Sequence, residues 1–220
     1  MKKTALFLAI PVLAIGYLAL HAHAAILPDP KQDVKAAGHR ETVVFAGGCF
    51  WGVQAVFQHV KGVESATSGY AGGAEKDAHY ETVSTGTTGH AESVEVKYDP
   101  EKVSFGQLLK VYFSVAHDPT QLNHQGYDEG TQYRSEIFFT SPGQEKAARA
   151  YIKQLDDANA FPSPIVTKIE PLKGFYPAED YHQNYATLHP ENPYIAINDL
   201  PKVARLQRQF PDLYVEDNAQ

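Results

Sequence analysis

The order of hydrophobic and polar residues from position 41 onward predicts a strand, a sharp turn and a helix. The run 41–46 (ETVVFA) is typical of a buried strand, and Gly47-Gly48 ends it. Apolar residues then recur at steps of three and four, which predicts a helix that begins at Cys49 and stops near Gly62. A thiol is therefore expected in the first turn of a helix that directly follows a strand.

Further along, the chain continues to alternate between short strands and helices. Strand patterns occupy 63–74, 93–98, 135–140 and 164–172. Ser104 and Ser141 are suited to cap helices that reach about residues 116 and 158.

The remaining stretches are polar or irregular. Glycine-, threonine- and tyrosine-bearing segments at 79–89 and 119–134 indicate loops, and 178–185 indicates a short helical piece. From residue 192 we expect an extended tail in which a helix forms over 201–209. With few, mostly antiparallel strands and no repeat or flexible linker, residues 41–220 are expected to form one α+β domain.

The first 40 residues carry the pattern of an export signal. Two lysines precede an uncharged, mostly apolar run at 4–20, and Ala22-His23-Ala24 follows as a small-residue cleavage site. We therefore expect residues 1–24 to be a signal peptide, residues 25–40 a polar leader, and the folded part to be exported, in the periplasm. The alternative is an uncleaved segment that anchors the chain to the membrane, because a run of this length is at the short limit of a spanning helix.

Composition and charge narrow the function classes. The 220-residue chain is 43% hydrophobic and 20% charged, which excludes a disordered or low-complexity chain and supports one sizeable core. Its formal net charge is −7 without a basic run, so nucleic acid is not an expected partner. The single cysteine excludes an intrachain disulfide and a cysteine-rich metal centre, and the ten histidines show no ligand spacing, so we expect no metal and no bound cofactor.

The position of Cys49 favours a reactive thiol. A helix N-terminus presents free N–H groups and a partial positive charge, which lower the pKa of a thiol. Gly47 and Gly48 permit a tight turn that leaves the sulfur uncovered, and Phe50 and Trp51 place two aromatic rings beside it. We therefore expect an ionised, accessible sulfur; the alternative is that Cys49 is a small hydrophobic residue of the core, as most free cysteines are.

Four short motifs follow one another along the chain. They are GGCFWG at 47–52, GHAE at 89–92, GTQYRS at 130–135 and AEDYHQ at 178–183. Together, in this order, they resemble the signatures of the A-type methionine sulfoxide reductases, the peptide-methionine (S)-S-oxide reductases. The resemblance covers about residues 42–185 and implies a two-layer α+β sandwich. We expect it to have a small mixed or antiparallel sheet, a ferredoxin-like core and a long coiled C-terminal tail.

The resemblance implies a role for each candidate side chain in the reduction of methionine (S)-sulfoxide. Cys49 is the nucleophile that attacks the sulfoxide sulfur, and Glu92 is the acid that protonates the oxygen. A carboxyl in an apolar pocket has a raised pKa and keeps its proton at neutral pH, as this role requires. Tyr80 and Tyr133 match tyrosines that donate hydrogen bonds to the oxygen, Asp128 matches a residue that holds the substrate backbone, and Phe50 and Trp51 resemble the hydrophobic seat of the S-methyl group.

Turnover leaves Cys49 as a sulfenic acid, which condenses with a second thiol. Many members of the family supply that thiol from a cysteine near the C-terminus, but residues 186–220 contain none. We therefore expect an external reductant, either a thioredoxin-like protein or a small thiol. Oxidised proteins or peptides are the expected substrates, with free methionine sulfoxide left open, and we expect a monomer.

Two other functions are compatible with these residues. Cys49 paired with a histidine such as His90 or His182 would make a cysteine hydrolase or acyltransferase, which requires a Cys–His hydrogen bond. The pocket of Phe50 and Trp51 alone would make a non-catalytic periplasmic module that binds oxidised, methionine-containing peptides.

Overall fold

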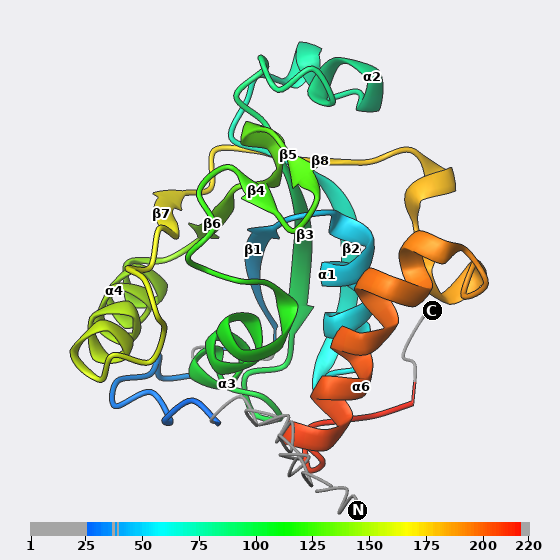
Figure 1. The fold of residues 1–220 in the computed structure, drawn as a ribbon. Helices are drawn as coiled ribbons and strands as arrows, with labels where there is room; N and C mark the ends of the chain where they lie inside the picture. The colour runs from blue at the N-terminus through cyan, green and yellow to red at the C-terminus, as the bar shows by residue number, and fades with distance from the viewer. Residues whose placement is uncertain (1–25, 37, 39, 217–220) are drawn as a thin grey trace, which may run out of the picture.

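A six-stranded sheet forms the centre of the protein. The computed structural model describes residues 26–36, 38 and 40–216 (Figure 1). The strand order is β7-β6-β1-β3-β2-β8, and every neighbouring pair is antiparallel except β6 and β7. The protein therefore combines helices with a mixed, mostly antiparallel sheet, in agreement with the predicted α+β class. The predicted signal peptide and its cleavage site lie outside the described residues.

The strands of this sheet are β1 (Glu41–Gly47), β2 (Val63–Ala71), β3 (Ala91–Tyr98), β6 (Ser135–Phe139), β7 (Lys168–Pro171) and β8 (Phe175–Pro177). The strand predicted at 41–46 is confirmed. Strand β3 begins two residues earlier than predicted, which places Glu92 inside the sheet. The segment 119–134 is not a plain loop, because β4 (His124–Gln125) and β5 (Asp128–Glu129) form a hairpin within it.

The α-helices are α1 (Phe50–Gln58), α2 (Tyr80–Val83), α3 (Phe105–Val111), α4 (Pro142–Asp157), α5 (Tyr185–Leu188) and α6 (Leu200–Gln209). Both predicted caps are confirmed. Ser104 forms a reciprocal capping box with Gln107 at the start of α3, and the hydroxyl of Ser141 accepts the backbone N–H of Gln144 at 3.3 Å at the start of α4.

Short 3₁₀ and π segments complete the fold. They are the 3₁₀ turns η1 (Glu75–Asp77), η3 (Thr131–Tyr133) and η4 (Asp180–His182) and the π segments η2 (Tyr112–Ala116) and η5 (Ile195–Asp199). The tail from residue 192 was expected to be extended, and this expectation is wrong in part. Segment η5 leads directly into α6, and α6 occupies the predicted 201–209 helix with one residue more at its start.

The main hydrophobic core lies between the sheet and the helices. Val43 and Phe45 of β1 point into this core, whereas Val44 and Ala46 point to the opposite face, as alternation along a strand requires. Helix α1 packs on β1, β2 and β3, α4 packs on β6 and β7, and α6 packs against α1 (Figure 1). The C-terminal helix is thereby held beside the helix that begins after Cys49.

The leader packs on the helices of the domain. Leu27 is buried, and the carbonyl of Pro28 accepts the hydroxyl of Tyr151 in α4 at 2.8 Å. The carboxylate of Asp33 accepts the N–H of Gly106 in α3 at 2.8 Å. Within the described part of the chain, no helix has both the length and the apolar character needed to cross a bilayer.

Candidate active site

The turn between β1 and α1 places Cys49 at the N-cap of the helix. Gly48 has a φ of +88°, and a Cβ on it would lie 2.7 Å from the side chain of Gln125. A Cβ on Gly47 would lie 2.8 Å from the ring of His117. The glycines therefore let neighbouring segments close over the turn. Cys49 is only 8% exposed, so the prediction of an uncovered sulfur is wrong for this conformation.

Strand β3 carries Glu92 to the first turn of α1. Oε2 of Glu92 accepts the backbone N–H of Phe50 at 3.1 Å, and the residue is 3% exposed. Burial raises the pKa of the Glu92 carboxyl to about 8, while the Phe50 N–H lowers this pKa and the charge of Asp128 raises it. The carboxyl therefore keeps its proton at neutral pH, as its predicted role requires.

Tyr80 begins α2 and Tyr133 ends η3, on two different loops. Burial, followed by the charge of Glu92, raises the pKa of both phenols, and Cys49 contributes in the same direction. The two hydroxyls therefore stay protonated and can donate hydrogen bonds. Their shared electrostatic neighbours indicate that both tyrosines lie around the site of Cys49 and Glu92. Glu179 positions the start of α2, because its Oε1 accepts the Tyr80 N–H at 3.0 Å.

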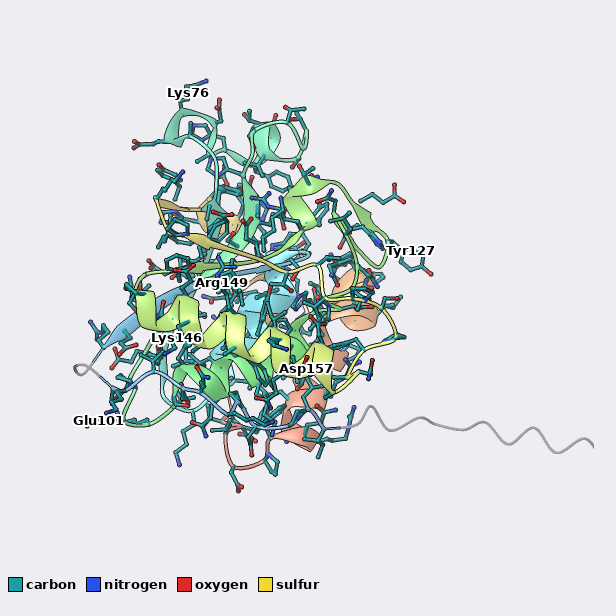
Figure 2. All side chains as sticks on the ribbon, turned by 90° about the vertical axis from the view of Figure 1, so that its left-hand side faces the viewer. Lys76, Glu101, Tyr127, Lys146, Arg149 and Asp157 are labelled. Atoms are coloured by element: carbon teal, nitrogen blue, oxygen red, sulfur yellow. The ribbon has the colours of Figure 1, made fainter. Side chains whose placement is uncertain are left out.

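Asp128 lies in β5 and is engaged by the C-terminal segment. Its Oδ2 accepts the hydroxyl of Tyr194. Tyr127, beside it at the tip of the hairpin, is 94% exposed and projects into solvent (Figure 2). A substrate backbone that binds Asp128 would have to share or displace the Tyr194 hydroxyl.

Phe50 and Trp51 differ in how far they face the site. Phe50 is buried, with its ring centroid 5.0 Å from that of His182. Trp51 is half-buried, and its Nε1–H donates to Nδ1 of His182 at 3.2 Å. The indole also stacks on Tyr185 at a centroid distance of 3.9 Å and meets the edge of Tyr194 at 6.0 Å. Of these two residues, Trp51 is therefore the one that can offer an aromatic surface to a ligand.

The sequence motifs did not assign several residues that surround Cys49. His182 lies inside the AEDYHQ motif, which is the only sequence signal that could have selected it for this site. Tyr194 and Asp199 lie in the stretch expected to be extended, and Lys202 lies in the helix predicted over 201–209. The packing of η5 and α6 on α1 brings Asp199 and Lys202 near the sulfur, and Tyr194 directly precedes η5.

The ionisation of Cys49 differs from the prediction. Burial raises the pKa of the Cys49 thiol well above its usual range, and the charges of Glu92 and Asp199 raise it further. The backbone N–H of Trp51 and the charge of Lys202 act in the opposite direction but are weaker. The helix N-terminus lies where the sequence predicted it, but desolvation outweighs its effect. The resting sulfur is a neutral thiol.

The histidines named for a hydrolase do not pair with the thiol. The backbone N–H of Gly73 donates to Nδ1 of His90 at 3.2 Å, and Nε2 of His90 lies 3.0 Å from the carbonyl of Ala74. Nδ1 of His182 accepts from Trp51. The Cys–His hydrogen bond that a cysteine hydrolase needs is therefore not formed among the described residues.

Other candidate sites lie apart from Cys49. Among residues 26–36, 38 and 40–216, no group of three histidine, cysteine or acidic side chains is arranged to hold a metal ion. A cavity of about 520 Å³ is lined by Gly89, Arg134 and Lys168 among others, and by none of the predicted site residues. The ionisable groups that the described structure gathers around Cys49 include the carboxyl of Glu92 and the phenols of Tyr80 and Tyr133.

Comparison with known proteins gives the family of the chain. The family model described as peptide methionine sulfoxide reductase matches residues 41–213. Peptide methionine sulfoxide reductase MsrA 2 of Mesorhizobium japonicum is 66% identical over 185 residues, which are 84% of this chain and 95% of that protein. MsrA 2 of Synechocystis is 48% identical over 204 residues, or 91% of this chain and 95% of that protein.

Solved structures give the same result for the fold. The reduced form of Mxr1 from Saccharomyces cerevisiae matches with a TM-score of 0.65 and 32% identity, covering 72% of this chain and 91% of that one. Methionine sulfoxide reductase A of Corynebacterium diphtheriae matches with a TM-score of 0.61 and 36% identity, covering 75% of this chain and 84% of that one.

A thiol at a helix N-cap, beside a protonated carboxyl and two phenols, is the site of a thiol-dependent enzyme with its own acid. The chain belongs to the peptide methionine sulfoxide reductase family. Within that family it is of the A type, since its relatives carry the name MsrA. Its activity is therefore thiol-dependent reduction of methionine sulfoxide, and the hydrolase and the non-catalytic binder receive no support.

Proposed function

We propose that the chain reduces the S-epimer of methionine sulfoxide in proteins and peptides, with Cys49 as nucleophile and Glu92 as proton donor. One observation carries these roles. Glu92 is a buried carboxyl that stays protonated at neutral pH, and it is hydrogen-bonded to the first residue of the helix that Cys49 caps. An acid that holds its proton beside a thiol is what the breaking of a sulfur–oxygen bond requires.

The proton balance of the step is compatible with the resting site. Cys49 begins as a neutral thiol, and Glu92 begins protonated. As the sulfur attacks, Glu92 protonates the sulfoxide oxygen, and the thiol proton replaces the proton that Glu92 gives up. The oxygen ends on Cys49 as a sulfenic acid, so the cysteine sulfur loses two electrons and the methionine sulfur gains two. No proton is taken from solvent.

Hydrogen bonds to the oxygen and an apolar seat for the methyl group would select the epimer. The phenols of Tyr80 and Tyr133 stay protonated and can donate to the oxygen as its charge develops. Trp51 offers the aromatic surface for the S-methyl group, with Phe50 supporting it from the core. Asp128 accepts a hydrogen bond from the substrate backbone in place of the Tyr194 hydroxyl.

Recycling of the enzyme needs a thiol from another molecule. Cys49 is the single cysteine of the sequence, so its sulfenic acid has no partner in the chain. A thioredoxin-like protein or a small thiol attacks the sulfenic acid and releases water, and a second thiol then reduces the mixed disulfide. We propose no bound cofactor and no metal for the reaction.

Separated epimers of a methionine sulfoxide peptide test the proposal. Incubation with enzyme and dithiothreitol, followed by chromatography, should convert the S-epimer to methionine and leave the R-epimer. Cys49→Ser should abolish conversion. Free methionine sulfoxide in the same assay defines the substrate range. Conversion of the R-epimer alone, or full activity of Cys49→Ser, would overturn the assignment.

We also propose that the chain is exported to the periplasm, with residues 1–24 removed as a signal peptide and the leader retained as part of a monomeric domain. The sequence pattern of the first 24 residues supports export. Cell fractionation and the intact mass of the purified protein test this. A mass that includes residues 1–24, recovered in the membrane fraction, would favour an uncleaved anchor.

The central strands are proposed to form a ferredoxin-like core. Strands β1, β2, β3 and β6 are spaced by helices α1 and α3 in a β-α-β-β-α-β order, and they lie in the sheet as β6-β1-β3-β2 with antiparallel neighbours. In this arrangement the loops after β1 and before β3 meet at one end of the sheet, which supports the placement of Cys49 and Glu92.

A further inference from the structure

An ion pair between a buried aspartate and a partly exposed lysine lies at the start of the C-terminal helix. Asp199 is fully buried, and its Oδ1 accepts Nζ of Lys202 at 3.1 Å. The other carboxylate oxygen of Asp199 is buried without a hydrogen-bond partner among the described residues. Leaving a buried carboxylate only partly satisfied costs stability, so the pair calls for a functional reason.

The pair packs against the first turn of α1, which directly follows the thiol. A Cβ on Gly52 would lie 2.1 Å from Oδ1 of Asp199 and 2.7 Å from Nζ of Lys202. Gly52 lies in the first turn of α1, three residues after Cys49, which caps that helix. Because Gly52 has no side chain, both charged groups can lie directly against the first turn of the helix that Cys49 caps.

The two charges have opposite effects on the pKa of the Cys49 thiol. The carboxylate of Asp199 raises the pKa of the Cys49 thiol, and the ammonium group of Lys202 lowers it. Other titratable side chains on the elements packed around the sulfur are Glu92 of β3, Asp128 of β5, Tyr80 of α2, Tyr133 of η3, Tyr194 and His117. Asp199 and Lys202 differ from these groups because they form an ion pair of opposite charges at the start of the C-terminal helix.

We propose that Asp199 and Lys202 together set the reactivity of Cys49, with Lys202 as the counter-charge for the thiolate and Asp199 as the residue that positions and partly offsets it. Both are positioning residues, because they act through the sulfur and not on the substrate. The proposal rests on the proposed function only in taking Cys49 as the nucleophile. The C-terminal segment, which contributes no cysteine, thus contributes charge.

Alkylation of the single cysteine measures this effect without substrate. The full chain is treated with iodoacetamide between pH 6.5 and 8.5, and the rate is read by intact mass spectrometry. Asp199→Asn leaves Lys202 unopposed and should speed alkylation roughly three- to tenfold, the effect of one partly screened unit charge. Lys202→Gln should slow alkylation by a similar factor. Lys202→Arg and the double variant Asp199→Asn/Lys202→Gln should both lie near the wild-type rate.

A second ion pair with the same spacing provides the control. Asp99 and Lys102 are also three residues apart, with 2.9 Å between Oδ2 and Nζ, but they follow the far end of β3 from Glu92. Glu101, between them, lies at the opposite end of the molecule from Lys76 (Figure 2). Asp99→Asn and Lys102→Gln should leave the alkylation rate unchanged.

The direction of the two effects separates charge from loosened packing. If Asp199→Asn and Lys202→Gln both speed alkylation, the pair merely covers the sulfur and the proposal fails; it also fails if neither differs from the control variants. Thermal melting followed by circular dichroism checks the fold of each variant. Should Lys202→Gln not fold, the pH profile of Asp199→Asn, followed upward until the alkylation rate levels off, carries the test. A charge effect must move the rise in its alkylation rate to lower pH, whereas an equal acceleration at every pH, the plateau included, would mean an uncovered sulfur and would overturn the proposal. Inactivity of Cys49→Ser is a separate result, so failure of one proposal does not imply failure of the other.

Discussion

Glu92→Gln removes the acidic proton from the site and little else. Glutamine keeps the size of the side chain and an oxygen that can accept the Phe50 N–H. With a pKa of about 8, roughly nine-tenths of the Glu92 carboxyls are protonated at pH 7, whereas a carboxyl at the usual 4.5 would be protonated in roughly 0.3% of molecules. Burial therefore increases the amount of usable acid by a factor of roughly 300.

Loss of a positioned acid costs about a hundredfold to ten-thousandfold in rate, or about 3 to 5 kcal/mol of barrier. We expect Glu92→Gln to lose activity within that range. The assay is a single turnover of the S-epimer without reductant, in which one equivalent of methionine is measured by chromatography. This isolates the first chemical step from recycling. The wild-type rate should fall as the pH rises through about 8, where Glu92 loses its proton, and the variant should lack this alkaline limb.

Glu95→Gln on the same strand is the matched control. Residues three apart on a strand point to opposite faces, so Glu95 lies on the other side of the sheet from Glu92, where it pairs with Lys97. It should retain the wild-type rate and pH profile. A Glu92→Gln enzyme within threefold of wild type, or one that keeps the alkaline limb, would show that another group supplies the proton.

Four further outcomes are expected. Trp51→Phe should raise KM about tenfold with a smaller change in kcat, because it loses aromatic area and the indole N–H that orients the ring; steady-state kinetics measures both. The folded pKa of Glu92 exceeds the unfolded one, so its contribution to stability is complete below about pH 4.5 and is lost as the pH rises through about 8. Urea unfolding at pH 5 and pH 8 should show a larger loss for wild type than for Glu92→Gln, by several kcal/mol. Gly52→Ala should lower the melting temperature because its Cβ meets a buried carboxylate at 2.1 Å, whereas Gly143→Ala, 3.3 Å from its nearest neighbour, should be neutral or stabilising. Ser104→Ala removes a helix cap and should cost about 1 kcal/mol in thermal unfolding.

Each of these expectations has a contrary result. An unchanged KM for Trp51→Phe would remove the aromatic seat from the mechanism. Equal pH dependence of unfolding in wild type and Glu92→Gln would contradict a raised pKa in the folded state. Equal melting temperatures for the two glycine variants would contradict close packing at Gly52, and an unaffected Ser104→Ala would place the stability of α3 in tertiary packing alone.

Local sequence signals predicted several strands and helix starts well. The strand before Gly47 and the caps at Ser104 and Ser141 depend on hydrogen bonds and alternation within a few residues, so the sequence alone was sufficient. The strand at 164–172 was predicted too long, because only β7 finds a neighbour in β6 there. The helix α2 and the hairpin of β4 and β5 were missed, because such short elements are stabilised by distant contacts and carry little pattern of their own.

What the sequence by itself determined is which chemistry is available: one thiol at a helix start, a carboxyl in a motif before a strand, and no second cysteine to resolve the oxidised sulfur. Only the tertiary structure decided the state of that chemistry. A thiol and a carboxyl that are 43 positions apart meet because β3 lies beside β1, and their pKa values rise because the surrounding segments exclude water. The ion pair of Asp199 and Lys202 reaches this site through the packing of η5 and α6 on α1. Desolvation depends on everything that surrounds a group, and no local pattern in the chain encodes it.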